Sequence, residues 1–332
     1  MHPAAGLDTI APGAKVLWVT STGGHLSELA LIAERVGASD QSVWVTSETE
    51  QSVGFLESKP HVYVDYVAPR DLAAAVRAAR RVAPLLRREG FDACVSTGAA
   101  VAGTILPLAA WSGIPTYYVE SLARSSAPSL TGRLLVRTPG VRTLTQHRAC
   151  ATGPWSYAGS ALDLWQSADS RAEDWPWPAA GPRPLKILVT LGTIAPYRFD
   201  RAVRAVLDLL APGDEVVWQL GSTTREDLPG RVLSQVSPQE IDTLSRDADV
   251  VIAHCGVGSL LQQLALGKSP VLAVRRSAHG EHVDDHQLEL ARTAAERGLA
   301  SVLDLDRPER RVLEAAADRA VLSRQPHLVA AA

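Results

Sequence analysis

A glycine-rich turn around residue 256 carries the clearest chemical signature in this sequence. The stretch HCGVGSLLQQLALGKSP (254–270) follows an apolar strand, and its glycines fall where a helix begins. Free backbone N–H groups and the positive end of the helix dipole bind anions at such a place, and a diphosphate fits it well. A tight turn that needs only positive φ is the competing explanation. The predicted diphosphate-binding residues are Gly256, Val257, Gly258 and Ser259.

A second turn of the same kind, TLGTIAPYRFD (190–200), offers hydroxyl groups for the same ligand. Thr190 and Thr193 are placed to hydrogen-bond a phosphate or uridine, and we add Thr193 to the diphosphate-binding set. Arg198 and Asp200 are spaced to pair with each other on the surface.

The segment GEHVDDHQ (280–287) has six polar or ionisable side chains in eight positions. Such polarity directly after a buried strand is unsuited to a core, whereas carboxylates and amides bind sugar hydroxyls through paired hydrogen bonds. The predicted sugar-binding residues are Glu281, His282, Asp285 and Gln287.

Two other interpretations of this segment stay open. A metal ion is one, with ligands drawn from His279, His282 and His286 and from Asp284 and Asp285. The sequence has no second ligand cluster, so we expect neither a metal nor another cofactor. The other is a solvated helix start, capped by one of the two aspartates.

In the first half, TSTGGHLSEL (20–29) again places glycines and a polar side chain where a strand turns into a helix. A histidine with a near-neutral pKa is suited to act as a general base, so His25 is the first catalytic candidate. A role in capping or packing is equally open for His25. Glu120, in YVES, is the second candidate base. The predicted acceptor-side residues are Gly23, Gly24, Thr97, Gly98 and Arg124.

The elements that must position these residues occur twice along the chain. KVLWVTSTGGH (15–25) and KILVTLGT (186–193) each pair a short apolar strand with a Gly/Thr/Ser turn. Residues 91–119 and 248–274 share a second pattern of strand, glycine turn, apolar helix and strand. Alternating strands and helices indicate parallel sheets, so we predict an α/β protein with two Rossmann-like domains facing a central cleft.

A stretch rich in proline and tryptophan separates the two halves. We place an N-terminal acceptor-side domain at 14–165, a linker at 166–184 and a C-terminal nucleotide-sugar-binding domain at 185–305. A C-terminal helix and tail are expected at 306–332.

The composition narrows the classes of protein. The chain has 332 residues and a net charge of −3, which gives no general case for nucleic-acid binding. Three widely spaced cysteines suggest neither a disulfide framework nor a metal site, and the N-terminus has no signal-peptide pattern. We therefore expect a cytoplasmic protein. The 27 uncharged residues between Asp92 and Glu120 are interrupted by glycines and prolines, which predicts strand, helix and strand rather than a membrane span.

The helix expected between Asp71 and Glu89 is basic and amphipathic, with Leu72, Val76, Ala79, Ala83 and Leu86 predicted along one face. Five arginines occupy another face. A solvated arginine face over a buried stripe is the commoner explanation of such a helix. Peripheral contact with anionic lipid at the inner face of the membrane is the alternative.

Together these motifs resemble two families of transferase subunits. TGGHL, SVWVTSETE, VSTGAAVA, YVESLARSSAPSLTGRLL and YAGS are similar to the membrane-associated acceptor-side subunit of transferases that add a sugar to polyprenyl-diphosphate-linked saccharides. Those include the eukaryotic enzyme of dolichol-linked glycan assembly and bacterial capsule and exopolysaccharide pairs. VTLGT, FDRAV, VVWQLGST, VIAHCGVGSLL and GEHVDDHQLELA resemble their donor-side subunit, a glycosyltransferase family 28 C-terminal domain.

The resemblance covers about residues 15–162 and 186–303 and implies that the two subunits are fused in one chain. It further implies the GT-B architecture and an inverting, metal-independent transfer from a UDP-sugar, such as UDP-N-acetylglucosamine or another UDP-hexose, to an acceptor hydroxyl. A lipid-linked saccharide is the expected acceptor. The sequence lacks the apolar anchor of the membrane-anchored members, and Gln262 stands where distant relatives have a ribose-binding acid.

Three alternatives remain at this point: a natural-product glycosyltransferase with a soluble acceptor, a UDP-sugar 2-epimerase of the same architecture, and a non-catalytic nucleotide-sugar-binding protein. The oligomeric state is not predicted.

Overall fold

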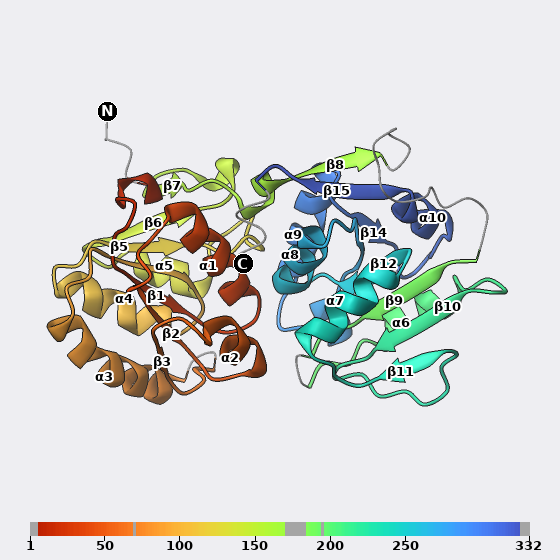
Figure 1. Ribbon diagram of the computed structural model, residues 1–332, viewed down its shortest axis with the longest axis horizontal. Helices are drawn as coiled ribbons and strands as arrows, with labels where there is room; N and C mark the ends of the chain where they lie inside the picture. Colours follow the sequence, from red (N-terminus) through yellow and green to blue (C-terminus); the bar gives the residue numbers. More distant parts are fainter. Residues whose placement is uncertain (1–5, 69–70, 170–183, 194–195, 326–332) are drawn as a thin grey trace. The chain divides into compact units, whose positions relative to one another are not determined.

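The structure is a computed structural model that describes residues 6–68, 71–169, 184–193 and 196–325 (Figure 1). It divides into two compact units, with the division between Ala161 and Leu162. Each unit is built around one parallel β-sheet, which is the α/β architecture expected from the sequence.

The first unit contains a parallel sheet of seven strands in the order β3-β2-β1-β4-β5-β6-β7. The strands are β1 Val16–Thr20, β2 Val43–Thr46, β3 His61–Tyr63, β4 Ala93–Gly98, β5 Thr116–Val119, β6 Val141–Thr145 and β7 Trp155–Tyr157. The helices are α1 Gly24–Val36, α2 Glu50–Leu56, α3 Leu72–Arg88, α4 Ala102–Trp111 and α5 Leu130–Leu135, with short 3₁₀ turns η1 Leu7–Thr9, η2 Arg148–Cys150 and η3 Ala161–Leu164.

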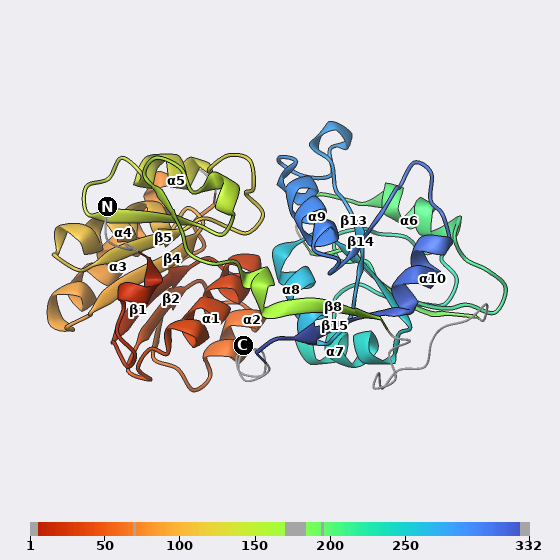
Figure 2. The ribbon, with the colours of Figure 1, turned by 90° about the horizontal axis from the view of Figure 1, so that it is seen from above.

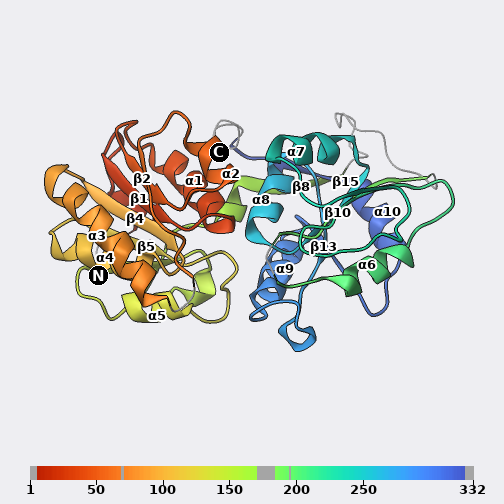
Figure 3. The same cartoon turned by 90° about the horizontal axis from the view of Figure 1, so that it is seen from below.

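Helices cover both faces of this sheet, which explains why strands such as VLWVT are apolar throughout. One apolar core joins the strands to α3, α4 and α5, and a second joins them to α1 and α2. Figures 2 and 3 show α3 and α4 on the opposite side of the strands from α1. The uncharged segment after Asp92 forms β4, α4 and β5, as predicted, and no helix in the described residues has the length and apolarity needed to cross a membrane.

The predicted buried face of α3 is wrong in its first half. Leu72 and Val76 are exposed, whereas Leu86 is buried as predicted. The rest of the buried stripe is formed mainly by Ala75, Ala78 and Val82. Small side chains let α3 pack closely on α4, where the Thr104 hydroxyl donates to the Ala75 carbonyl at 3.1 Å. Close approach of the helices thus decided which of two apolar stripes is buried.

The second unit repeats the arrangement with six parallel strands in the order β11-β10-β9-β12-β13-β14. They are β9 Lys186–Thr190, β10 Glu215–Gln219, β11 Arg231–Leu233, β12 Val250–His254, β13 Val271–Ala273 and β14 Ser301–Leu303. The helices are α6 Asp200–Leu207, α7 Pro238–Asp247, α8 Val257–Ala265, α9 His286–Glu296 and α10 Arg311–Ala317, with the 3₁₀ turn η4 Ser277–His279.

Two antiparallel strands that the sequence did not predict complete the second unit. Strand β8, Trp165–Asp169, pairs with β15, Arg319–Ser323, and Figures 2 and 3 show the two side by side. The predicted linker 166–184 therefore begins with a strand, and its residues 170–183 lie outside the described part of the chain. The expected C-terminal helix is the short α10, followed by β15 rather than by an irregular tail.

A buried ion pair attaches α10 to the body of the second unit. Both carboxylate oxygens of Asp214 accept backbone N–H groups, from Leu185 at 2.9 Å and from Ala211 at 2.8 Å. The Arg310 guanidinium donates to the same carboxylate and to the Leu209 carbonyl. The Asp214 side chain is only 2% exposed, so loss of Arg310 would leave a buried charge without its partner.

We expect Arg310→Met to lower the free energy of unfolding of the second unit by about 2–4 kcal/mol, because breaking a buried pair costs far more than breaking an exposed one. Urea denaturation of the full chain measures the change. Arg231→Met is the matched control, since Arg231 pairs with Glu240 on the surface and should change stability by less than about 1 kcal/mol. Equal effects of the two substitutions would contradict the assignment.

Candidate active site

Both sheets place their candidate residues at the same topological position. The strand order reverses between β1 and β4 in the first unit and between β9 and β12 in the second. Ligands of open α/β sheets bind beyond the carboxyl ends of the strands at such a point. His25 and Gly98 lie there in the first unit, and Thr193 and Gly256 lie there in the second.

In the first unit, His25 lies in the first turn of α1, directly after Gly23 and Gly24. Its ring packs on Gly98, where a Cβ atom would come within 3.2 Å of Cε1 and the backbone has φ +112. The Thr97 hydroxyl donates to the His25 carbonyl at 2.8 Å. The structure thus brings together four predicted residues of this half around one imidazole that is about a third exposed.

The surroundings of Glu120 are those of a structural side chain rather than of a catalytic base. Its carboxylate is buried and accepts hydrogen bonds from the Tyr118 hydroxyl at 3.0 Å and from the N–H and hydroxyl of Ser129 at 2.9 and 3.1 Å. Its contacts fix the loop between β5 and α5 rather than a reacting hydroxyl. Arg124, in the same loop, is half-buried, and its N–H donates to the Ser121 carbonyl.

Sequence reasoning missed the carboxylate that does lie beside His25. Glu28 is on α1, one turn after His25, and its Oε2 lies 3.7 Å from Nδ1 of His25. The Glu28 side chain is completely buried, and burial raises its pKa to about 8 against the opposing hydrogen bonds from Leu122, Gln146 and Ser121. The i,i+3 spacing of His and Glu in GGHLSE was the available signal, because such residues share one face of a helix.

In the second unit, α8 begins at Val257 with Gly256 as its N-cap. The N–H groups of its first turn, on Val257, Gly258 and Ser259, have no partner within the helix and are directed along its axis beyond the N-terminus. Thr193 is exposed beside this end of the sheet, whereas the Thr190 hydroxyl donates to Gln219 in the interior. The residues predicted to bind the diphosphate therefore form a helix N-terminus at the ends of β9 and β12.

His254 is a further residue of this site that was not predicted. A Cβ atom at Gly192 would lie 2.7 Å from its ring, and one at Gly256 would lie 2.6 Å from its Nε2, so the ring fits only between two glycines. Its Nδ1 lies 3.4 Å from the Ser259 hydroxyl. Burial, helped by the nearby Arg275 charge, lowers the pKa of His254 to about 4, so the imidazole is neutral at physiological pH.

The segment 280–287 is held by internal contacts that the sequence did not indicate. Glu281 forms a buried ion pair with Arg201 and accepts the Arg276 N–H at 3.0 Å. Gln287 is also buried, and its side-chain oxygen accepts the Arg275 N–H at 3.2 Å. Glu281 and Gln287, both predicted to bind the sugar, make buried contacts in this structure that hold the loop in place.

Asp285 is the most exposed member of the predicted sugar set, and His282 lies beside it in the same segment. Asp285 accepts hydrogen bonds from the N–H and hydroxyl of Ser277, at 2.8 and 3.0 Å, which lowers its pKa. His282 is largely buried, and its ring stacks near Tyr197 at 6.0 Å between centroids. Burial lowers the pKa of His282.

Arg275 connects the two polar loops of the second unit. Its completely buried guanidinium donates to the carbonyls of Leu191 at 2.7 Å, Tyr197 at 3.0 Å and Glu281 at 3.0 Å, and it lies over the Phe199 ring. One cation therefore fixes the loop after β9 and the start of the polar segment. The strand ending VLAVRR gave no sign that this arginine would be buried.

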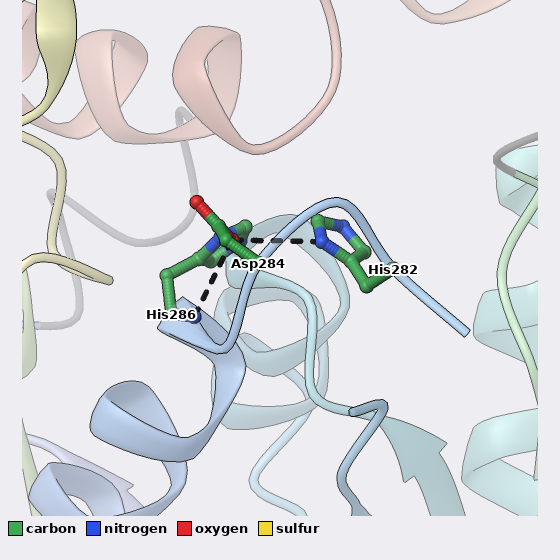
Figure 4. Close-up of side chains that lie close together, drawn as sticks. All are labelled: His282, Asp284 and His286. Carbon is green, nitrogen blue, oxygen red and sulfur yellow. Dashed lines mark hydrogen bonds and ion pairs between the residues drawn. The ribbon is translucent and has the colours of Figure 1, made fainter. Parts of the chain in front are cut away.

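His282, Asp284 and His286 form a compact cluster in which Asp284 lies between the two rings (Figure 4). Asp284 Oδ1 lies 3.6 Å from Nδ1 of His282 and contacts Nδ1 of His286 directly. Three ligand atoms within 4.8 Å of one another have the chemistry of a transition-metal site. The same contacts also describe an aspartate that orients two histidines.

Comparison with known proteins identifies the class of this site. Residues 186–322 match the model of the glycosyltransferase family 28 C-terminal domain. The chain is a glycosyltransferase. The match spans β9 to β15 and therefore contains α8, His254 and the polar segment.

Relatives of this glycosyltransferase extend over both units. The chain is 28% identical, over 89% of its length and 84% of the relative's, to the UDP-N-acetylglucosamine–N-acetylmuramyl-(pentapeptide) pyrophosphoryl-undecaprenol N-acetylglucosamine transferase of Parasynechococcus marenigrum. The corresponding protein of Prochlorococcus marinus (strain MIT 9303) is also 28% identical, over 89% of this chain and 83% of its own.

Solved structures share its two-domain GT-B fold. Acinetobacter baumannii MurG matches with a TM-score of 0.57 at 18% identity and covers 91% of this chain and 93% of its own. A calicheamicin glycosyltransferase matches with a TM-score of 0.56 at 17% identity, covering 96% of this chain and 92% of its own.

We expect the His254 ring of the glycosyltransferase to remain neutral down to about pH 5, because its pKa of about 4 lies below the ordinary 6.5. The unfolded chain then binds more protons than the folded chain between these two values, so this group makes stability fall as the pH falls from about 6.5 towards about 4. NMR titration of the ring, assigned with His254→Gln, checks this. A midpoint near 6.5 would contradict the assignment of a half-buried imidazole that stays neutral.

Proposed function

We propose that this glycosyltransferase moves a sugar from a UDP-sugar, such as UDP-N-acetylglucosamine or another UDP-hexose, to a hydroxyl of a polyprenyl-linked saccharide, with inversion and without a metal. The observation that carries the proposal is the start of α8, where the N–H groups of the first helical turn lie next to the His254 ring. The relatives named above act on a UDP-linked sugar and an undecaprenol-linked acceptor.

The donor diphosphate is assigned to the second unit. N–H groups of Val257, Gly258 and Ser259 would bind its oxygens and stabilise the charge that grows as the glycosidic bond breaks. The neutral His254 adds no charge beside the diphosphate, and its Nδ1 lies 3.4 Å from the hydroxyl of Ser259. Asp285 and His282 are assigned to the sugar, with Thr193 at the diphosphate, while Glu281 and Gln287 keep the sugar-binding loop in place.

The acceptor is assigned to the first unit. A hydroxyl next to His25 would lose its proton to the imidazole while its oxygen attacks the anomeric carbon. Direct displacement through an oxocarbenium-like state inverts the anomeric configuration. Gly23 and Gly24 stand at the start of α1, whose N–H groups would donate hydrogen bonds to a phosphate of a diphosphate-linked acceptor. We propose that the chain thus unites an acceptor-side and a donor-side half, which elsewhere are separate subunits.

We further propose peripheral association with the cytoplasmic face of a membrane. The helices α3, α4 and α5 share one layer of the first unit and expose apolar side chains, with Leu72 76% and Trp111 73% exposed. Leu130 and Leu134 of α5 are exposed as well. Exposed arginines accompany them on α3: Arg80, Arg81, Arg87 and Arg88. Apolar and cationic side chains together suit an anionic lipid surface.

The decisive experiment measures UDP release from a panel of UDP-sugars in the presence of added acceptors. Release that depends on a polyprenyl-linked saccharide is expected. Release only with soluble natural-product acceptors favours the first alternative, and conversion of the UDP-sugar without any acceptor favours an epimerase. UDP bound without any release or conversion would indicate the non-catalytic binding protein.

For the donor site, Gly258→Val should weaken UDP binding at least about tenfold, because a branched side chain would occupy the place of a phosphate. Isothermal titration calorimetry measures the affinity. Gly54→Val is the matched control, since a Cβ atom there meets open space on α2. Unchanged UDP affinity in a folded Gly258→Val protein would remove the assignment of the diphosphate to α8.

Metal independence predicts that EDTA leaves the transfer rate within about twofold of its original value, because the N–H groups of α8 replace the metal as the stabiliser of the leaving group. The rate with and without EDTA is the measurement. Activity that EDTA abolishes and Zn²⁺ restores would instead point to a metal site. If Zn²⁺ no longer restores activity in the His286→Gln variant, the cluster in Figure 4 is that site.

Membrane association predicts that the chain sediments with phosphatidylglycerol vesicles at low salt, because each basic residue near the surface contributes roughly 1 kcal/mol that salt screens. Replacing Arg80, Arg81, Arg87 and Arg88 by Glu should abolish it. The matched control reverses four exposed arginines of the second unit: Arg204, Arg231, Arg292 and Arg324. Negligible sedimentation of all forms would favour a soluble acceptor.

A further inference from the structure

The carboxyl group of Glu28 has an asymmetric environment. Its Oε1 accepts from the Leu122 N–H at 2.5 Å, from the Gln146 amide at 3.0 Å and from the Ser121 hydroxyl at 3.4 Å. Its Oε2 is buried and has no hydrogen-bond partner among the described residues. Nδ1 of His25 lies 3.7 Å from Oε2.

A buried carboxyl oxygen without a partner is costly unless another group satisfies it. The distance of 3.7 Å suits an ion pair and exceeds a normal hydrogen bond, and catalytic contacts are often long before a substrate binds. His25 cannot swing away freely, because its ring packs on Gly98. Oε2 is therefore directed at one nitrogen of a ring that is itself held in place.

We propose that Glu28 is a positioning residue that holds the proton of His25 on Nδ1 and thereby leaves the lone pair on Nε2 for the acceptor hydroxyl. The inference rests on the proposed function, in which His25 is the base. When the acceptor oxygen attacks the anomeric carbon, its proton moves to Nε2, and the electron pair of the breaking glycosidic bond leaves with the diphosphate. The ionised Glu28 then faces the imidazolium.

The protonation state of Glu28 decides which ring nitrogen of His25 carries the proton. Oε1 faces three hydrogen-bond donors, so a neutral carboxyl must carry its proton on Oε2 and donate it to Nδ1. His25 then keeps its own proton on Nε2 and loses its basic nitrogen. Only the ionised form of Glu28 supports catalysis, and burial raises the pKa of Glu28 to about 8. The other ionisable groups near Glu28 are Glu120, whose charge raises this pKa further, and Tyr118, which donates to Glu120.

Because the two groups interact, they titrate as a pair, and the rate follows the loss of one shared proton. The transfer rate should therefore rise with pH through the region around 8 and level off above it. A histidine without this partner would give no such rise there.

Glu28→Gln tests the proposal without a change of shape. The amide oxygen must replace Oε1 opposite the three donors, so the amide NH₂ faces Nδ1 and donates to it. We expect ¹⁵N NMR to show the Nε2–H form of His25 in this variant and the Nδ1–H form in the wild type above about pH 8. The transfer rate should fall at least about a hundredfold, with an unchanged dissociation constant for UDP.

Glu34→Gln is the matched control, because Glu34 lies on the same helix but nine residues after His25, about 13 Å further along the helix axis. This variant should change neither the ring signals nor the rate. Glu28→Asp should keep the Nδ1–H form and recover part of the rate. Should Glu28→Gln not fold, the ring signals of wild-type His25 across the pH range give the same test.

Different results would contradict the positioning role of Glu28 and the proposed function. Ring signals of His25 that are independent of pH around 8 and of Glu28→Gln, in an enzyme that transfers sugar, would overturn the positioning role. A switch of the His25 proton that depends on Glu28, in a protein that transfers no sugar to any acceptor, would support the positioning role and overturn the proposed function.

Discussion

The N–H groups in the first turns of α1 and α8 have no partners within their helices, and much of the structure serves to keep these two helix ends accessible. Both helices begin beyond the carboxyl ends of central strands, at the point where the strand order reverses. Glycines precede each start, and a histidine lies beside each: His25 on Gly98 in the first unit, and His254 between Gly192 and Gly256 in the second. A larger residue at any of these glycines would displace the imidazole that completes the site.

Buried ionisable side chains hold the loops around these helix ends. Glu28 accepts hydrogen bonds from Leu122 and Gln146, which belong to two different connections of the first unit. Arg275 donates to the carbonyls of Leu191, Tyr197 and Glu281 in the second unit. Each side chain exchanges its hydrogen bonds to water for several within the protein, which offsets the cost of burying a polar group. These contacts hold the loops around the candidate site in place, while Asp285 and Thr193 remain closer to solvent.

The sequence predicted the repeated α/β halves, the helix start at α8 and the glycine turns next to His25, because all of these depend on local patterns of apolar strands and glycines. It missed Glu28, whose carboxylate lies 3.7 Å from the His25 ring. It did not predict the Arg275 contacts, the engagement of Glu281 with Arg201, or the four hydrogen bonds of Glu120. These depend on which loops meet after folding, and no spacing within one segment encodes that. The prediction of the buried face of α3 failed for a related reason. The alanine stripe and the Leu72 stripe both fit an amphipathic helix, and only the packing of α4 decides which of them is buried.

The pairing of β8 with β15 joins residues 165–169 to residues 319–323. A ribosome completes all seven strands of the first sheet before it begins the second unit, so the first unit is able to fold while the rest is still being synthesised. Strand β8 is synthesised well before its antiparallel partner, which is complete only once residues 319–323 have been made. An unpaired strand edge is a template for pairing with another chain, and the pairing with β15 removes that edge from β8.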